Sequence, residues 1–310
     1  MRAYGGDAGA VCVWGRDSIG GLIVPRLAIT QIECAVGDVQ KNVDRACDMV
    51  AEAAGQGADL VLFPEMFTTG FPLEDLPRLA EPIPGPTTQR LSDAATQHGI
   101  CVVAGMAEKD EQTGKLHNAS VVLGPDGDLL TRYRKVYLYL GEREVLTRGS
   151  EACLVDLGFV VAGVTICYDY IFAHYVHGLV ERGAELLLHP TAWVTTDDCE
   201  RWKYSPMAYR AQGLTRALEN SVYLASSNLW GVCDPTGYLR GVGQSAIIAP
   251  WGEILAEIPS GEGVAVAEVD FSLSPKWREA AAPYLADWDR VIRWPVIIPG
   301  AEKEAPGAVP

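Results

Sequence analysis

The sequence of 310 residues predicts an α/β fold in which two packed β-sheets carry helices on their outer faces. Segments with a strand pattern and segments with a helix pattern alternate along the chain. The strand segments are long apolar runs, which is typical of sheets that are covered on both faces. The two halves of the chain have similar content, and no linker-like segment separates them. We therefore expect one main domain, over residues 26–288.

Hydrophobic periodicity predicts the elements of the first half of the chain. The segment 124–127, Gly-Pro-Asp-Gly, predicts a hairpin turn between two of its strands. One helix has an apolar face at Val43, Cys47, Val50 and Ala54. The elements are, in order, a strand over 27–32, a helix over 39–54, a strand over 58–63, a helix over 87–98, and strands over 100–106, 119–123 and 128–133.

The second half of the chain repeats this alternation of strands and helices. Its longest helix has an apolar face at Met207, Ala211, Leu214 and Leu218. The elements are a strand over 159–166, a helix over 172–182, a strand over 185–189, a helix over 206–219, strands over 222–226, 245–249, 254–257 and 264–269, and a short helix over 275–286.

The two ends of the chain are expected to lie outside the main domain. Residues 1–25 are interrupted by Gly, Asp and Arg, so they predict a poorly ordered extension with no signal-peptide core. Residues 289–310 end in Ala, Gly, Pro and Glu and predict an extended tail. Because the stretch 294–298 is too apolar to remain in water, we expect the tail to dock on the body or on a partner subunit.

The bulk composition excludes several classes of function. A net charge of −15 argues against a nucleic-acid partner, because phosphate binding requires basic patches. The eight cysteines are scattered singly, which indicates neither a zinc site nor a disulfide framework and favours the reducing cytoplasm. No apolar run approaches the ~18 residues of a membrane span. His174 and His177 lie three residues apart, but no acidic or thiol ligand pair lies near them in the sequence, which argues against a metal site.

Cys167 lies at a predicted corner between the strand over 159–166 and a helix. A thiol at such a corner lies near the positive end of a helix dipole, which favours the thiolate. A sharp turn also leaves the next backbone N–H free to face a substrate oxygen. Most free cysteines are small buried hydrophobes, so the corner alone leaves both interpretations open.

Three charged residues follow the ends of predicted strands in the same way. Glu65 follows an apolar strand, where partial burial raises the pKa of a carboxylate and makes it a usable base. Lys135 could stabilise a developing oxyanion, and Glu142 lies seven residues further on. Taken singly, each is also explained as a surface charge. Together with Cys167 they supply the nucleophile, base and electrostatic clamp that acyl transfer through a thioester requires.

Several motifs in this order resemble the nitrilase superfamily of carbon–nitrogen hydrolases, in its amidase-like branch, over about residues 26–290. The shared order and spacing of these motifs carry the resemblance. The matching segments are 27–31 (LAITQ), 62–66 (LFPEM), 133–138 (YRKVYL), 141–149 (GEREVLTRG), 166–169 (ICYD), 183–193 (GAELLLHPTAW) and 216–220 (RALEN) with 227–228 (SN).

The resemblance implies a four-layer αββα sandwich of two mixed β-sheets flanked by helices, assembled as a homodimer or a larger oligomer. It implies Cys167 as nucleophile, Glu65 as general base, Lys135 as the transition-state clamp and Glu142 as a positioning glutamate. The backbone N–H of Tyr168 would be a second oxyanion donor. No metal or organic cofactor is implied. The expected reaction converts a small carboxylic amide into an acid and ammonia.

The sequence departs from the common pattern of this family after the nucleophile. Ile171 stands where an arginine is common, and His174 stands where a glutamate is common. His174 is a candidate substrate contact, although a histidine that fills a structural gap explains it as well. The other residues expected to line the pocket, with core packing as the alternative for each, are Tyr139, Tyr170, Ile171 and Trp193. These side chains favour an uncharged or aromatic amide.

Two other functions stay open at this point. One is an N-carbamoyl amine or amino acid amidohydrolase, although the places where basic residues would hold a substrate carboxylate are occupied by Tyr137 and Ile171. The other is a catalytically silent scaffold that binds a ligand in the same pocket. Retention of Glu65, Lys135 and Cys167 argues against the silent scaffold.

Overall fold

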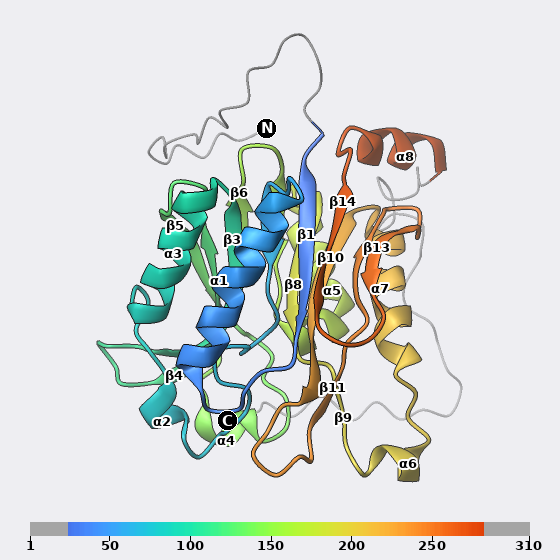
Figure 1. Ribbon diagram of the computed structural model, residues 1–310. Coiled ribbons are helices and arrows are strands. Elements are labelled where there is room, and N and C mark those ends of the chain that lie inside the picture. Colours follow the sequence, from blue (N-terminus) through green and yellow to red (C-terminus); the bar gives the residue numbers. More distant parts are fainter. Residues whose placement is uncertain (1–23, 282–310) are drawn as a thin grey trace.

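The computed structural model describes residues 24–281 (Figure 1). The predictions made for the tail over 289–310 and for nearly all of the extension over 1–25 therefore lie outside the described residues. Most of the predicted elements are found within a few residues of their expected places. Among residues 24–281, none of the helices combines the length and the hydropathy that a membrane span requires.

The strands form one connected mixed sheet in which β1 occupies the centre. The main order is β5-β4-β3-β2-β1-β10-β8-β7-β6, and the remaining strands pair with β1 or β10 or with one another. The strands are β1 (Arg26–Ile32), β2 (Leu60–Leu62), β3 (Cys101–Lys109), β4 (Leu116–Leu123), β5 (Leu129–Arg134), β6 (Cys153–Asp156), β7 (Val161–Val164), β8 (Leu186–Thr191), β9 (Val194–Thr195), β10 (Tyr223–Val232), β11 (Arg240–Val242), β12 (Ser245–Ile248), β13 (Ile254–Ile258) and β14 (Gly263–Glu268).

The hydrogen bonding connects the two halves of the chain that the sequence predicts as two sheets. β1 pairs in parallel with β2 at three positions, from Leu27 to Ile29. It pairs with β10 only at its far end, where Gln31 and Ile32 lie opposite Asn228 and Leu229. This short junction joins the two halves into a single sheet, so the finding is a mixed α/β fold with one large connected sheet.

Three apolar clusters fill the interior of this fold. One contains the inner face of α1 together with β1–β3, and another contains residues of α5 and α7 with β8 and β10. The third joins residues of both halves of the sheet, such as Leu62 of β2 and Leu188 of β8. The helices are α1 (Val39–Gly55), α2 (Leu76–Leu79), α3 (Pro86–His98), α4 (Glu142–Val145), α5 (Ala173–Glu181), α6 (Cys199–Trp202), α7 (Met207–Asn220) and α8 (Leu273–Ala281).

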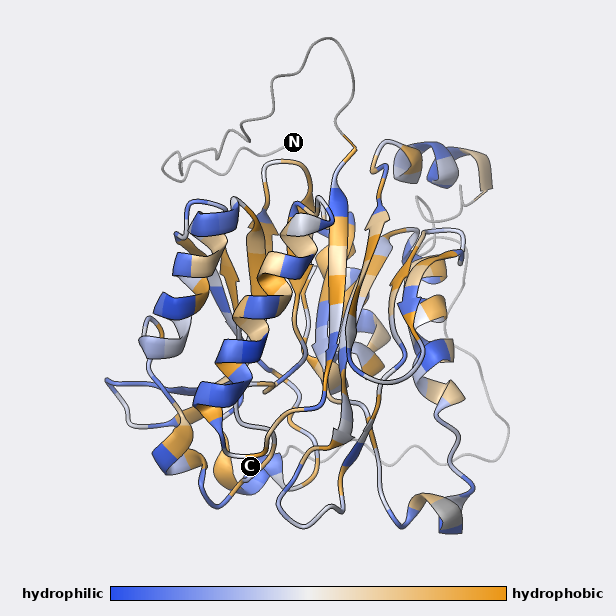
Figure 2. Ribbon diagram, viewed as in Figure 1, coloured by the Kyte–Doolittle hydropathy of each residue, from blue (hydrophilic) through white to orange (hydrophobic). Residues whose placement is uncertain are grey.

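Local sequence explains where the longer helices begin and end. The side chain of Asp38 caps α1 by accepting a hydrogen bond from the backbone N–H of Lys41. α3 begins at Pro86, whose missing N–H costs nothing at a first helical position, and is followed by Gly99 in the left-handed conformation (φ 62°). Figure 2 shows the resulting pattern, with hydrophobic colours concentrated on the central strands and hydrophilic segments along α1 and α3.

The elements that the sequence did not predict are short. β6, β9, β11, α2, α4 and α6 each contain four residues or fewer, too few for a hydrophobic period to appear. After Cys167 the chain forms a 3₁₀ turn, η1 (Cys167–Ile171), and α5 begins only at Ala173. This turn interrupts the helical pattern that the sequence places directly after Cys167.

A close backbone contact at Gly105 on β3 positions the turn that follows β2. A Cβ atom at this position would lie 2.5 Å from the carbonyl oxygen of Pro64 and 2.7 Å from the Cα of Glu65. Both neighbours are backbone atoms, so the clash could be relieved only by moving the chain. Glycine is therefore required here for close packing of β3 against the Pro64–Glu65 backbone.

Replacing this glycine tests the contact. We expect Gly105→Ala to lower the free energy of unfolding by about 1–3 kcal/mol, because it overpacks a site bounded by backbone. The matched control is Gly55→Ala at the end of α1, where an added Cβ has nothing within 4 Å. Urea unfolding of both variants measures the difference, and equal stability of the two would contradict the role of Gly105.

Candidate active site

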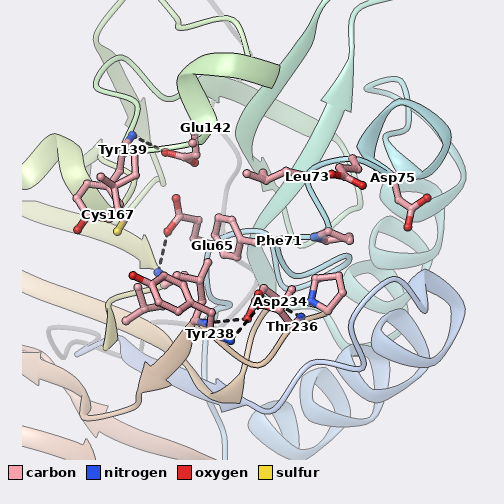
Figure 3. A pocket seen from close by; sticks show the side chains of 18 of the residues that line it. Glu65, Phe71, Leu73, Asp75, Tyr139, Glu142, Cys167, Asp234, Thr236 and Tyr238 are labelled. Carbon is pink, nitrogen blue, oxygen red and sulfur yellow. Dashed lines mark hydrogen bonds between the residues drawn. The ribbon is translucent and has the colours of Figure 1, made fainter. Parts of the chain in front are cut away.

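Glu65, Lys135, Glu142 and Cys167 come together in one buried cluster, although they lie on different elements. Lys135 Nζ lies 2.6 Å from Glu65 Oε1 and 2.8 Å from Glu142 Oε2. All four residues are buried, and they line one cavity together with Tyr139, as Figure 3 shows for Glu65, Glu142 and Cys167. The structure therefore brings these four residues together in one place.

Glu65 is held at both carboxylate oxygens. It follows β2, next to Met66, whose φ of 48° turns the chain sharply. Its Oε2 accepts a hydrogen bond of 2.7 Å from the backbone N–H of Ala192, just after β8. Its Oε1 faces Lys135. These partners on both oxygens fix the orientation of the Glu65 carboxylate.

Cys167 occupies the strained corner that the sequence predicts. Its φ of 45° lies in the left-handed region, which residues with a side chain rarely adopt. Such backbone strain is often found at functional sites. The turn is closed by Asp169, which accepts a hydrogen bond of 2.8 Å from the N–H of Ile166. Tyr168 is the second residue of η1, within the first helical turn, where N–H groups have no partner inside the helix.

Asp169 also ties the Cys167 turn to the segment that carries Lys135. Its Oδ1 accepts from the backbone N–H groups of Val136 (3.2 Å) and Tyr137 (2.8 Å), and its Oδ2 accepts from the hydroxyl of Tyr133 (2.7 Å). Asp169 thus fixes the spacing between two members of the cluster. This role was not predicted from the sequence, although Asp169 lies only two positions after Cys167 in the segment 166–169.

Asn118 on β4 is a second site residue that was not predicted from the sequence. Its Nδ2 donates hydrogen bonds of 2.7 Å to Glu65 Oε1 and to Glu142 Oε1. Its backbone carbonyl oxygen accepts a hydrogen bond of 2.8 Å from the backbone N–H of Lys135. The sequence offered one signal, a polar residue directly before the predicted strand over 119–123; its burial, which requires hydrogen-bond partners, is visible only in the structure.

The electrostatics of the cluster follow from burial and from the paired charges. Burial raises the pKa of Glu65, although the Lys135 ammonium opposes this. Burial lowers the pKa of Lys135, but the carboxyl groups of Glu142 and Glu65 outweigh it and hold this pKa well above its ordinary value. Lys135 is therefore a permanent cation, whereas Glu65 is a carboxyl group that can gain and lose a proton.

The thiol of Cys167 does not have the lowered pKa that its corner position predicts. Burial, followed by the neighbouring Glu65 carboxylate, raises its pKa far above the ordinary value, although Lys135 lowers it. Burial outweighs the helix dipole here, because η1 is a single short turn. The sulfur therefore keeps its proton until a base removes it.

Two cavities of about 480 Å³ and about 530 Å³ meet at Cys167. We call the first the acidic lobe, because Glu65, Glu142, Glu74, Asp75 and Asp234 line it. We call the second the aromatic lobe, because Tyr168, Trp193, Trp202 and Tyr204 line it. The residues shared by both lobes are Tyr139, Leu140, Cys167, Ala192, Val194 and Tyr238.

The structure separates the residues expected to line the pocket into two groups. Tyr139, Ile171 and Trp193 line the aromatic lobe. Tyr170 lines neither lobe, because it is buried and stacks on His189 with ring centroids 3.9 Å apart. His174 also lines neither lobe, because it lies on the outer side of α5.

His174 has a structural partner instead of a substrate contact. Its Nε2 lies 3.2 Å from the hydroxyl of Tyr137.

No group of three or more His, Cys, Asp or Glu side chains within residues 24–281 is arranged to hold a metal ion.

The carboxyl group of Asp169 gives a test of this geometry through pH. Burial raises its pKa from the ordinary 3.8 to about 6, although hydrogen bonds from Tyr133 and from the backbone lower it. The folded state then holds this proton more tightly than the unfolded state. The free energy of unfolding therefore decreases as the pH rises from about 4 to about 6 and the group loses its proton.

Asp169→Asn removes this titration. We expect the unfolding free energy of the natural protein, measured relative to that of the variant, to decrease between about pH 4 and about pH 6 and to stay level above that. Urea unfolding over this pH range measures the difference. A difference that does not vary with pH would contradict a buried, titrating carboxyl group at this position.

Comparisons with known proteins identify the family. The sequence profile of the carbon–nitrogen hydrolase family matches residues 26–279. The chain is 34% identical over 248 residues to omega-amidase NIT2 of Xenopus tropicalis, covering 77% of this chain and 86% of the relative. It is 33% identical over 255 residues to omega-amidase NIT2 of Homo sapiens, covering 79% and 88%.

Solved structures agree with this result. Nit3 of Saccharomyces cerevisiae, a member of branch 10 of the nitrilase superfamily, aligns with a TM-score of 0.75 at 26% identity, covering 83% of this chain and 94% of Nit3. A mutant amidase from Nesterenkonia sp. AN1 in complex with butyramide aligns with a TM-score of 0.68 at 25% identity, covering 85% and 97%. The chain therefore belongs to the carbon–nitrogen hydrolase family, within the nitrilase superfamily.

Proposed function

We propose that this enzyme hydrolyses a small carboxylic amide to the acid and ammonia through a thioester on Cys167. The observation that carries the proposal is the contact of Lys135 with Glu65 and Glu142 in a cavity that Cys167 also lines. Glu65, Lys135 and Cys167 would supply the base, the oxyanion-stabilising cation and the nucleophile that acyl transfer requires. The amidase activity named for relatives of this chain supports the same reaction.

In the first step, Glu65 removes the thiol proton as the sulfur of Cys167 attacks the amide carbon. The proton has to be taken during the attack, because the raised pKa of Cys167 keeps the free thiol protonated. The negative charge that develops on the amide oxygen is met by the Lys135 ammonium and by the N–H of Tyr168. Loss of one such donor typically slows the reaction by roughly a hundredfold or more.

In the second step, the tetrahedral intermediate collapses to a thioester. Glu65 donates its proton to the departing nitrogen, so ammonia leaves and the carboxylate is restored. Glu65 then takes a proton from water as the water attacks the thioester carbon. Collapse of the second intermediate releases the carboxylic acid and returns the proton to the sulfur of Cys167.

Glu142 and Asn118 keep these groups in position. Glu142 accepts hydrogen bonds from Lys135 Nζ and, at 2.6 Å, from the backbone N–H of Tyr139. Asn118 joins both glutamates. A buried ammonium would be strongly destabilising without such partners, so these contacts hold the cation at the reaction centre.

The expected substrate is a small uncharged or aromatic amide, and the apolar walls of the cleft support this proposal. Both lobes have largely apolar or aromatic walls, formed in part by Phe71, Tyr139 and Trp193. The amidase of Nesterenkonia sp. AN1 has been solved with butyramide, a small uncharged amide. An aromatic amide fits the aromatic lobe by the same argument.

The finer points of architecture and setting are also inferences. The cluster shared by both halves of the sheet and the clusters beneath the helices support the four-layer αββα arrangement. A homodimer or larger assembly and a cytoplasmic location stay predictions from the sequence. Size-exclusion chromatography with light scattering would measure the assembly.

The thioester is tested by intact mass spectrometry after mixing with candidate amides. We expect an acyl adduct on one thiol of the natural protein and none on Cys167→Ala, whose ammonia release should fall by about a thousandfold or more. Cys47→Ala is the matched control, because Cys47 lies half-buried on α1, away from the cleft. Ammonia release that survives in Cys167→Ala would reject the proposed nucleophile.

A further inference from the structure

Thr191, the last residue of β8, lies beside Cys167 at the end of the pairing between β7 and β8. These two strands run parallel, and Val164 at the end of β7 pairs with Leu188. Three residues further along both chains, the same register brings Cys167 opposite Thr191. Paired strands lie about 5 Å apart, so the side chains of opposite residues are within reach of a hydrogen bond.

The pair of residues that precedes them shows that the register continues past the end of β7. The backbone N–H of Thr165 donates to the carbonyl oxygen of Leu188 at 3.0 Å. The side chains of Thr165 and His189 lie on the same face, with Oγ1 2.8 Å from Nδ1. Because side chains alternate between the faces of a strand, Cys167 and Thr191 are the next pair on this face.

The hydroxyl of Thr191 is buried, and among the described residues it has no hydrogen-bond partner. The backbone around it is fixed. The carbonyl oxygen of Thr191 accepts from the N–H of Glu65 at 3.4 Å, and the N–H of Ala192 donates to Glu65 Oε2 at 2.7 Å. Buried hydroxyl groups without a partner are rare because they lose their bonds to water. This one is therefore free to bind a partner that forms during the reaction.

The other groups that favour a negative sulfur already have partners. Burial, followed by Glu65, raises the pKa of Cys167, whereas Lys135, the hydroxyl of Thr191 and the N–H of Ala192 lower it. The Lys135 ammonium is paired with two carboxyl groups, and the N–H of Ala192 is bound to Glu65. Of these three donors, the hydroxyl of Thr191 is the one that is not already used in a hydrogen bond.

We propose that Thr191 is a further catalytic residue, whose hydroxyl donates a hydrogen bond to the Cys167 sulfur whenever that sulfur carries negative charge. This inference rests on the proposed function and adds a residue to its mechanism. The bond forms as Glu65 removes the thiol proton, and again as the sulfur leaves the second tetrahedral intermediate. Thr191 keeps its own proton in both steps. It lines neither lobe, so it stabilises the transition state without contributing to substrate binding.

Two substitutions separate the hydroxyl of Thr191 from its methyl group. Thr191→Val keeps the shape and removes the hydroxyl, whereas Thr191→Ser keeps the hydroxyl. We expect Thr191→Val to lower kcat for butyramide by about tenfold and to change KM by less than about twofold, because the lost bond forms only on a charged sulfur. Thr191→Ser should stay within about threefold of the natural kcat. Thr195→Val on β9 is the matched control, because Thr195 lines neither lobe, and it should leave kcat unchanged.

Alkylation of Cys167 by chloroacetamide gives a second measurement that does not require turnover. The mass of the peptide that contains Cys167 reports its rate. We expect Thr191→Val to be alkylated about three- to tenfold more slowly at each pH, because less thiolate forms, although a more basic sulfur is also more nucleophilic. Urea unfolding measures the structural contribution. Thr191→Val should be at least as stable as the natural protein, because the hydroxyl has no partner in the resting enzyme.

The outcomes separate this inference from the function on which it rests. Natural rates of alkylation and of butyramide hydrolysis in Thr191→Val would overturn it. A lower free energy of unfolding in Thr191→Val, with an unchanged alkylation rate, would overturn it too, because the hydroxyl would then serve folding alone. Slow alkylation of Thr191→Ser would assign the effect to the methyl group instead. Failure to hydrolyse or form an adduct with any amide would refute the proposed function, while the alkylation rates would still decide the role of Thr191.

Discussion

The buried contact of Lys135 with Glu65 and Glu142 is the interaction on which the rest of the site depends. Charges removed from water are tolerated only where partners satisfy them, and removing one partner leaves an uncompensated charge. The surrounding structure meets this requirement from separate strands and turns: Asn118 bridges the two glutamates, and Ala192 and Tyr139 donate backbone N–H groups. The constraint that stabilises the ion pair therefore also fixes the geometry proposed for catalysis.

The same burial controls the reactivity of Cys167. An exposed low-pKa thiolate would react with any electrophile or oxidant, whereas this thiol keeps its proton because burial and the Glu65 carboxylate disfavour the anion. In the proposed reaction the nucleophile forms only when an amide carbon is in place and Glu65 can take the proton. The strained backbone at Cys167 and the hydrogen bonds of Asp169 keep the sulfur within reach of that base.

The cleft around this centre divides into two lobes that meet at Cys167 and have different walls. Carboxyl groups line one lobe, and aromatic rings line the other. Lys135 is already paired with Glu65 and Glu142. In the proposed function, the amide is therefore selected by the other side chains that line the two lobes.

The sequence by itself determined the order of the longer strands and helices, the family, and Glu65, Lys135, Glu142 and Cys167 as site candidates, because apolar periodicity and motif spacing are local properties of the chain. Only the tertiary structure showed that a two-residue junction at the end of β1 joins the sheet, that Asn118 and Asp169 complete the cluster, and that Tyr170 and His174 lie outside the cleft. The direction of a side chain after an irregular turn, and the partner of a polar residue inside a strand, depend on packing between segments far apart in sequence. No local pattern encodes that packing.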